Sequence, residues 1–333
     1  MSKACEYKVV DQELLLGFYK KLLWDRILPH IPDRITPNAI TVTGQVMVGI
    51  AVLLAYAATQ TSDWLFPFSS LFLLGYLTAD NLDGPHARRT GQSSPLGEFL
   101  DHGLDGLASG AVLICTALTL RVTGWWMVAL CVLGSIGFIV SFWEQTRRGV
   151  LIIPEMGATE GITLLILMQT TVVLSRSAPW MSFNPHDFTN VATLIMCFVL
   201  FGYTLAIIPP VWRVAKARIL PWEILPIIAL TAPYMLFVLR GANPLYPSIA
   251  VSVYAANFVC RAITLRHHAR EINVVRVTDA IALIPIFGLA GRWFPVDHWA
   301  ALSMVLALMH YGVNLALGIR GLDPATKPVE ARQ

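Results

Sequence analysis

Apolar segments long enough to cross a bilayer follow one another along almost the whole of this chain. Hydrophobic residues make up 56% of its 333 residues, and charged residues only 14%. A helix needs about 20 mainly apolar residues to span the hydrocarbon core, and it satisfies its backbone hydrogen bonds internally. We therefore predict an all-α polytopic membrane protein with about ten transmembrane helices, at 39–59, 64–82, 96–120, 125–143, 160–175, 189–211, 221–239, 245–265, 277–291 and 298–318.

The basic residues indicate which side of the membrane faces the cytoplasm. Of the 24 lysines and arginines, only Arg121, Arg176, Arg240 and Arg292 fall on the side that the first predicted span reaches. Cytoplasmic loops carry an excess of basic residues, so we predict that both termini are cytoplasmic. The same bias explains the net charge of +3, so we expect no nucleic-acid partner.

A segment at 11–28 precedes the first span and differs from it in pattern. Its apolar residues Leu14, Leu15, Phe18 and Leu22 fall at helical spacing among charged residues. This pattern is typical of an amphipathic helix lying in the cytoplasmic membrane interface, and a solvent-exposed helix is the alternative.

No soluble domain or low-complexity segment is visible, so any chemistry has to be built from the spans and their cytoplasmic ends. We predict four regions on this basis. They are a cytoplasmic N-terminal segment at 1–38, catalytic spans at 39–212, C-terminal spans at 213–319 and a cytoplasmic tail at 320–333. We expect the C-terminal spans to form a lipid site or dimer contacts.

Four aspartates lie near the cytoplasmic ends of the second and third predicted spans. Asp80 and Asp83 are three residues apart, and Asp101 and Asp105 are four apart. These spacings place each pair on one face of a helix. Because a short basic turn joins the two helices, the faces can meet, and the four carboxylates are expected to converge just below the membrane surface.

Such a convergence is costly without a cation. An aspartate at the bilayer centre costs about 2.5–3.5 kcal/mol, less near the interface, and the four carboxylates also repel one another. Solvated charges at helix ends explain one or two of them, but not two same-face pairs on adjacent helices. A divalent cation satisfies the whole array, and all-oxygen ligands favour Mg²⁺, Mn²⁺ or Ca²⁺.

The residues between the aspartates favour a phosphate ligand. Gly84 and Ala87 are small enough for a ligand to approach the backbone, and Arg88 offers a forked donor for phosphate oxygens. Gly97 lies one turn before Asp101 and leaves space beside it. Small residues in membrane helices usually serve helix packing, so it is the combination that indicates phosphate binding.

Together these residues form one pattern, Asp80-x2-Asp83-Gly84-x2-Ala87-Arg88-x8-Gly97-x3-Asp101-x3-Asp105. It resembles the signature of the CDP-alcohol phosphotransferases at every position. "TPNAIT" before the first span resembles the Pro-Asn-x-Ile-Thr sequence of that family, and "RRTGQSSPLGEFLDHGLD" is most similar to its choline/ethanolamine phosphotransferase branch. Those enzymes transfer a headgroup from CDP-choline or CDP-ethanolamine to diacylglycerol, and release CMP.

The resemblance implies two bound Mg²⁺ (or Mn²⁺) ions. Asp80, Asp83 and Asp101 are expected to hold one, and Asp80, Asp101 and Asp105 the other. It also implies a homodimer in a membrane whose lipids include the acceptor and the product. This membrane is expected to be the endoplasmic reticulum in a eukaryote or the inner membrane in a bacterium. A further set of residues is expected to bind the CDP moiety: Asn38, Gly84, Ala87, Arg88 and Gly97.

Two residues are candidates for the general base. In the wider family the last aspartate, Asp105, is often given this role, whereas the resemblance to the choline/ethanolamine branch implies His102 with help from Glu160. A metal-bound carboxylate is a poor proton acceptor, and a neutral imidazole titrates near physiological pH, so we favour His102. We expect His86 to be an exposed loop residue rather than a catalyst.

Three alternatives stay open. A prenyltransferase of the UbiA type also uses aspartate-rich helices and Mg²⁺, although its two motifs lie far apart in sequence. A divalent-cation transporter would need polar groups across the whole bilayer, whereas these carboxylates gather at one face. Within the resembled family, other members transfer a phosphatidyl group from CDP-diacylglycerol to a small alcohol.

Overall fold

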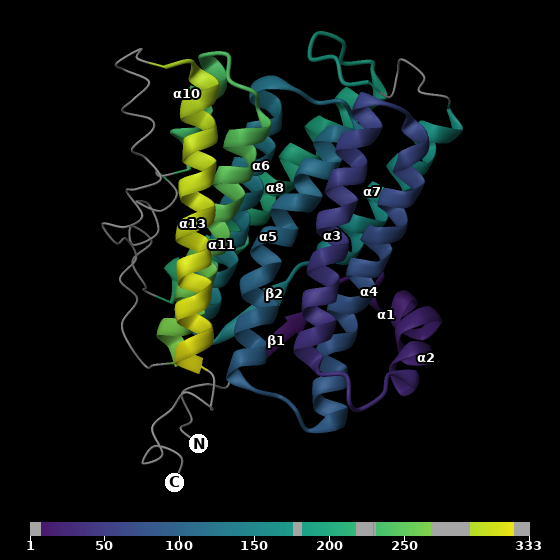
Figure 1. Ribbon diagram of the computed structural model, residues 1–333, viewed down its shortest axis with the longest axis vertical. Coiled ribbons are helices and arrows are strands. Elements are labelled where there is room, and N and C mark those ends of the chain that lie inside the picture. Colours follow the sequence, from purple (N-terminus) through teal and green to yellow (C-terminus); the bar gives the residue numbers. More distant parts are fainter. Residues whose placement is uncertain (1–7, 176–181, 218–228, 230, 268–293, 323–333) are drawn as a thin grey trace. The chain divides into compact units, whose positions relative to one another are not determined.

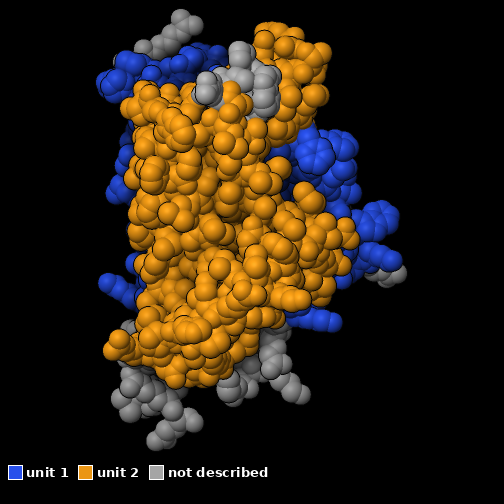
Figure 2. Space-filling view, turned by 90° about the vertical axis from the view of Figure 1, so that its right-hand side faces the viewer, with its two compact units in different colours: residues 1–9, 123–152, 198–333 blue, residues 10–122, 153–197 orange. Residues whose placement is uncertain are grey.

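The computed structural model describes the chain except for residues 1–7, 176–181, 218–228, 230, 268–293 and 323–333. The described part is almost entirely helical (Figure 1). Its residues form two compact units, each built from segments that are separate in sequence (Figure 2). Unit 1 comprises 1–9, 123–152 and 198–333, and unit 2 comprises 10–122 and 153–197.

Unit 2 is a bundle of four long helices. They are α3 (Pro37–Gln60), α4 (Phe66–Thr90), α5 (Pro95–Thr119) and α7 (Ala158–Leu174), with the short 3₁₀ helix η4 (Asp63–Leu65) before α4. Helix α3 packs against α4 and α5, and α7 packs against the same two helices. All the residues of the aspartate pattern lie in this bundle.

Local signals fix the ends of the helices around the α4–α5 turn. Ser94 caps α5, because its hydroxyl accepts a hydrogen bond from the Gly97 N–H at 3.0 Å, and Pro95 follows as the first helical residue. Gly91 ends α4 in the left-handed region with φ of 67°, a conformation that glycine adopts without strain. The connection is therefore only residues 91–94, which keeps the two aspartate pairs close.

Helix α4 runs eight residues beyond the predicted end of the second span at 82. The turn predicted after that span is wrong for this stretch, because Pro85 is accommodated inside the helix and Arg88 and Arg89 form its last turn. Basic residues at a helix C-terminus are favoured by the helix dipole.

The N-terminal segment is only partly the helix that its pattern predicts. It begins with the strand β1 (Lys8–Asp11), which pairs with β2 (Val150–Ile153) in a two-stranded sheet that the sequence analysis did not predict. Short helical stretches then follow one another: α1 (Leu16–Tyr19), the π-helix η2 (Lys20–Trp24), α2 (Asp25–Ile27) and the 3₁₀ helix η3 (Leu28–His30). Leu14, Phe18 and Leu22 are exposed on this segment.

Unit 1 contains the remaining helices. They are α6 (Gly124–Arg148), the larger part of α8 (Val191–Lys216), α10 (Tyr234–Leu239), α11 (Leu245–His267) and α13 (Val296–Leu322). Helix α11 is the most buried of them, because it packs against α6, α10 and α13.

Six described helices are long and apolar enough to cross a membrane: α3, α5, α6, α8, α11 and α13. Helix α7 is also apolar but shorter, and α4 carries the charged pattern. The prediction of an all-α membrane protein is confirmed. The number of ten spans stays a prediction, because the expected span at 277–291 and much of that at 221–239 lie outside the described residues.

Candidate active site at the α4–α5 turn

The structure brings the four predicted aspartates together at one end of unit 2. Single ligand atoms of Asp101, His102 and Asp105 all lie within 4.8 Å of one another. Asp80 interacts electrostatically with Asp105, Asp101 and Asp83. The helical spacings therefore place both pairs where the sequence suggested. Their role as metal ligands stays a prediction.

Two hydrogen bonds orient Asp83, the most buried of these carboxylates that the structure describes. Its Oδ2 accepts a hydrogen bond from the Thr41 hydroxyl of α3 at 2.5 Å, and its Oδ1 accepts one from the Gly84 N–H at 2.6 Å. Thr41 belongs to the "TPNAIT" stretch, but the sequence analysis gave it no role. Its place in that stretch was the only feature of the sequence that could have indicated this role. Helical spacing could not, because the contact joins residues 42 positions apart.

Asp105 lies between two side chains that could direct it. The Tyr76 hydroxyl donates toward Asp105 Oδ1 at 3.5 Å, and His102 Nδ1 lies 3.8 Å from Asp105 Oδ2. His102 is partly buried, with 14% of its side chain exposed. It is close enough to Asp101 and Asp105 to share an ion with them, so the geometry is compatible both with a base and with a ligand.

The predicted nucleotide residues also come together in part. A Cβ atom at Gly97 would lie 3.4 Å from Asn38 Oδ1, so the absence of a side chain leaves room for the Asn38 amide. A Cβ atom at Gly84 would lie 3.4 Å from Arg88 Nη1, so this guanidinium reaches back along α4 over the glycine. Ala87 lies between them in sequence, half-buried in the same helix. Their binding of CDP stays a prediction.

Glu160 is held by backbone groups at the start of α7. Its Oε2 accepts a hydrogen bond from the Gly157 N–H at 2.9 Å, which caps the helix, and its Oε1 accepts one from the Leu15 N–H at 2.7 Å. The side chain is buried. Each carboxylate oxygen therefore already accepts a backbone hydrogen bond, and one of them ties the N-terminal segment to α7.

Further bonds reinforce this attachment of the N-terminal segment. Glu13 accepts from the Thr159 N–H at 2.9 Å and from the Thr159 hydroxyl at 2.6 Å, and the Tyr19 and Thr163 hydroxyls are 2.9 Å apart. Burial raises the pKa of Glu13, and the hydrogen bonds from Thr159 offset part of that rise. The sequence analysis did not predict this contact, since it joins residues about 145 positions apart and no local pattern indicates it.

His86 is a correction to the sequence analysis. The prediction of an exposed loop residue is wrong, because α4 continues through this position and buries the ring completely. Arg89 Nη2 lies 3.0 Å from Nδ1, and the Ile35 carbonyl lies 2.7 Å from Nε2. Because an arginine can only donate, this network assigns the proton to Nε2, which donates to Ile35. His86 therefore holds the segment before α3 against α4.

A comparison with known protein families shows to which family the chain is related. A sequence model of the CDP-alcohol phosphatidyltransferase family matches residues 34–204, just over half of the chain. The chain belongs to this family. The resemblance drawn from the aspartate pattern is thereby confirmed.

Similar proteins include members of the branch that the pattern resembles. Choline/ethanolaminephosphotransferase 1 of Arabidopsis thaliana is 31% identical over 237 residues, which cover 64% of this chain and 60% of the plant protein. Choline/ethanolaminephosphotransferase 1 of Saccharomyces cerevisiae is 28% identical over 186 residues, 54% and 48% of the two chains. An uncharacterized class-I family protein 3 of Dictyostelium discoideum is 29% identical over 188 residues, 54% and 47%. The aligned region thus spans about half the length of these relatives.

The family match has consequences for the site. It includes every residue that was singled out, from Asn38 to Glu160. Membership and the relatives support a transferase of phospholipid biosynthesis in a membrane, and the Asp101, His102 and Asp105 group is compatible with the divalent cation that such transferases use. The homodimer expected from the resemblance stays a prediction.

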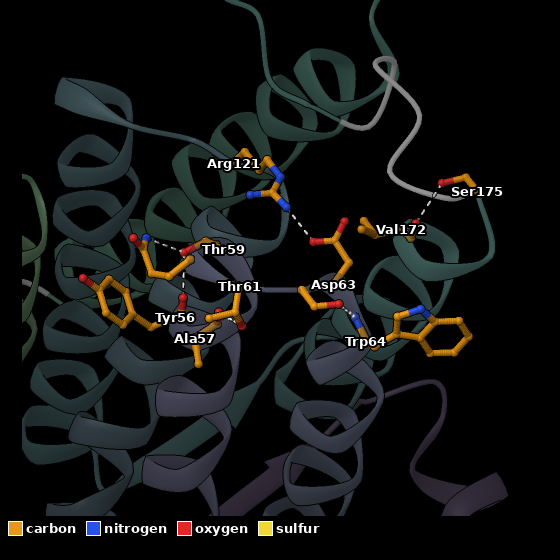
Figure 3. Close-up of polar contacts among 11 residues, drawn as sticks. Tyr56, Ala57, Thr59, Thr61, Asp63, Trp64, Arg121, Val172 and Ser175 are labelled. Atoms are coloured by element: carbon orange, nitrogen blue, oxygen red, sulfur yellow. Dashed lines mark hydrogen bonds and ion pairs between the residues drawn. The ribbon is translucent and has the colours of Figure 1, made fainter.

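A cavity of about 530 Å³ lies at the other end of unit 2. Figure 3 draws several of the residues that line it, among them Asp63, Trp64 and Arg121. Arg121 points into it toward Asp63, and the two side chains form an ion pair at 2.5 Å. Asp63 precedes α4 and Asp80 lies 17 residues later, which at 1.5 Å per helical residue is roughly 25 Å along the helix. The cavity is therefore separate from the aspartates, and we give it no role in the reaction.

Proposed function

We propose that this protein transfers phosphoethanolamine or phosphocholine from CDP-ethanolamine or CDP-choline to diacylglycerol, with release of CMP. The observation that carries this proposal is the convergence of Asp101, His102 and Asp105 with Asp80 and Asp83 in the order of the family signature. The relatives named choline/ethanolaminephosphotransferases support the choice of donor and acceptor.

The donor set suits hard divalent cations. Four carboxylates gather where Asp83 is almost fully buried, and carboxylate oxygens are the ligands that Mg²⁺ and Mn²⁺ prefer. We propose that Asp80, Asp83 and Asp101 hold one ion and that Asp80, Asp101 and Asp105 hold a second. When bound, such ions neutralise charge on the pyrophosphate of the donor and on the departing CMP.

The side chains around the aspartates position the donor in this proposal. Arg88 is exposed at the end of α4 and offers its forked donors to the phosphate oxygens. Asn38 lies beside Gly97 and contacts the nucleotide from α3. Gly84 and Ala87 leave the backbone of α4 open to the donor. The donor then lies between α3, α4 and α5, at the end of the bundle that we predict to be cytoplasmic.

His102 acts as the general base. It takes the proton of the diacylglycerol hydroxyl while that oxygen attacks the phosphorus that bears the headgroup, and the bond from this phosphorus to the CMP oxygen breaks. Asp105 Oδ2 faces His102 Nδ1 at 3.8 Å, so a carboxylate is placed to stabilise the imidazolium that forms. Proton transfer by a positioned side chain contributes typically about 10²–10⁴-fold in rate.

The test is an assay of donor choice with the purified protein in lipid nanodiscs. CDP-ethanolamine, CDP-choline and CDP-diacylglycerol are each supplied with Mg²⁺ and a matching acceptor, and CMP release is measured. We expect turnover with one or both of the first two donors when diacylglycerol is present. Asp101→Asn serves as the inactive control. Turnover with CDP-diacylglycerol and a small alcohol alone would instead establish a phosphatidyltransferase and refute the proposal.

A further inference from the structure

Two arginines converge on one buried carboxylate in unit 1. Glu144, near the end of α6, is almost fully buried. Arg213 of α8 binds it with both arms of its guanidinium, from Nε to Oε1 at 2.6 Å and from Nη2 to Oε2 at 2.7 Å. Arg148, one turn further along α6, donates from Nη1 to the same Oε1. We call these three residues the Glu144 cluster.

The Glu144 cluster carries more positive charge than its own carboxylate can neutralise. One carboxylate faces two guanidinium groups, so the cluster has a net charge of +1. Three N–H donors point at Glu144, and a guanidinium has five N–H donors. Most donors of the pair therefore have no partner among the described residues. The side chains of Arg148 and Arg213 are 29% and 28% exposed, so a molecule outside the helices can reach them.

A neighbouring donor is also left without a partner. Gln145 follows Glu144 in α6 and is only 1% exposed, yet its Nε2 has no hydrogen-bond partner in the described structure. A buried amide donor without a partner costs free energy, because it has lost its hydrogen bonds to water. The last turn of α6 thus combines an excess cation with a buried donor that no described residue satisfies.

The residues beside Arg213 indicate the depth of the cluster in a membrane. Phe201, Leu205, Ile208 and Trp212 are exposed along α8 at helical spacing, as expected of a surface that contacts acyl chains. Trp212 directly precedes Arg213, and exposed tryptophans are enriched at the level of the lipid headgroups. The guanidinium groups therefore lie at headgroup level, on the side that the basic residues predict to be cytoplasmic.

We infer that the Glu144 cluster binds the phosphate of an anionic phospholipid. Arginine forks match phosphate oxygens, and basic sites between membrane helices on the cytoplasmic side are suited to acidic headgroups. A phospholipid can contact both features of this surface. Its phosphate can bind Arg148 and Arg213, and its acyl chains can pack on the apolar face of α8. A soluble phosphate would contact only the two arginines.

A different explanation needs no ligand. Both arginines lie in the last turns of their helices, where a cation is stabilised by the helix dipole and can bind free carbonyl groups. In that case one arginine would serve Glu144 and the other the helix end, and added lipid would not distinguish Arg148 from any other surface cation.

Arg148→Gln separates the two explanations. It removes the excess charge and leaves the two-armed Arg213–Glu144 pair intact, so the fold should persist. Lys216→Gln is the matched control, because Lys216 is an exposed cation at the end of α8 outside the cluster. Glu144→Gln changes the cluster in the opposite sense, since it leaves both guanidinium groups without a carboxylate.

The measurement is retention of phosphatidylglycerol by the purified protein in native mass spectrometry, with phosphatidylcholine and inorganic phosphate as further probes. We expect the wild type and Lys216→Gln to retain one phosphatidylglycerol. Arg148→Gln should bind it about fivefold more weakly, the factor for about 1 kcal/mol per basic residue. Glu144→Gln should bind it more tightly. Equal losses in Arg148→Gln and Lys216→Gln, or equal binding of phosphatidylcholine or inorganic phosphate, would overturn the inference.

Discussion

The Thr41 hydroxyl donates a hydrogen bond to Asp83 Oδ2 across 2.5 Å, which joins the start of α3 to the aspartates of α4. Both side chains are buried, so the bond is shielded from water. Asp83 also accepts from the Gly84 N–H, and the two bonds together fix the plane of its carboxylate. A carboxylate fixed in this way is prepared to bind a cation without first being reordered.

Thr41→Val should therefore weaken cation use while the protein remains folded. Loss of a group that orients a metal ligand typically costs about 10–100-fold in metal affinity or activity. We expect the Mg²⁺ concentration for half-maximal activity to rise by about that factor. Thr43→Val is the control, since the exposed Thr43 hydroxyl bonds, within the described part of the chain, only the Ala39 carbonyl of its own helix. An unchanged Mg²⁺ titration in Thr41→Val would refute this role.

Gly157→Ala should weaken the attachment of the N-terminal segment to α7. A Cβ atom at Gly157 would collide with the carboxylate of Glu13, so that side chain has to leave Thr159. Hydrogen exchange of the backbone at 8–24 should become faster, because the Glu13–Thr159 bonds, which are part of what holds the segment, are broken. Gly161→Ala is the matched control in the same helix, where a Cβ atom meets no neighbour within 4 Å. Equal exchange in both variants would contradict the prediction.

The attachment of the N-terminal segment should also depend on pH through Glu13. Burial raises the pKa of this carboxyl above its ordinary value of 4.5. The attached state therefore binds more protons than the detached state between the two values, so attachment weakens as pH rises from 4.5 through the raised pKa. The protection of the amides at 8–24, taken as their exchange rate relative to an unstructured chain at the same pH, should fall over that range. Glu13→Gln should abolish this fall in protection, whereas Asp25→Asn, at an exposed position of the segment, should keep it.

His86→Ala should destabilise the fold around the α4–α5 turn. It leaves the Ile35 carbonyl without its donor and opens a cavity where a fully buried ring lay, and losses of this kind cost about 1–3 kcal/mol. We expect a lower midpoint of thermal unfolding in detergent. His30→Ala is the control, because His30 is exposed and, among the described residues, its ring bonds the Arg26 carbonyl only four positions earlier. Equal midpoints for the two variants would show that His86 has no such role.

The predictable part of the site is the part that depends on local spacing. Asp80 with Asp83, and Asp101 with Asp105, share helix faces because a helix repeats every 3.6 residues, and the sequence displays that period directly. The short connection at 91–94 then brings the faces together. The membrane character of the chain could be predicted as directly, since a run of about 20 apolar residues is long enough to span a bilayer.

The parts that sequence reasoning missed depend on distant contacts. Thr41 bonds Asp83, and Glu13 bonds Thr159, over separations that no periodic pattern reports. The burial of His86 was missed because a proline beside two arginines looks like a turn, although the helix accommodates Pro85. The bond from the Leu15 N–H to Glu160 was missed because it also joins distant parts of the sequence. The two strands were missed for the same reason, since they form only where residues 8–11 pair with 150–153.

The last prediction separates the proton acceptor from the metal ligands. His102→Ala should lower turnover about 10²–10⁴-fold and leave CDP-alcohol binding intact, because the four aspartates and Arg88 are unchanged. Asp105→Ala should lose Mg²⁺ affinity and nucleotide affinity together. Glu160→Gln loses a carboxylate oxygen that accepts a backbone N–H, so a role in docking predicts faster exchange at 8–24 with an unchanged pH–rate profile. A role in supporting His102 predicts instead that the acid limb of that profile moves to lower pH, since an imidazole without its negative neighbour is less basic. Near-normal turnover in His102→Ala would show that His102 is not the base and would make Asp105 the better candidate.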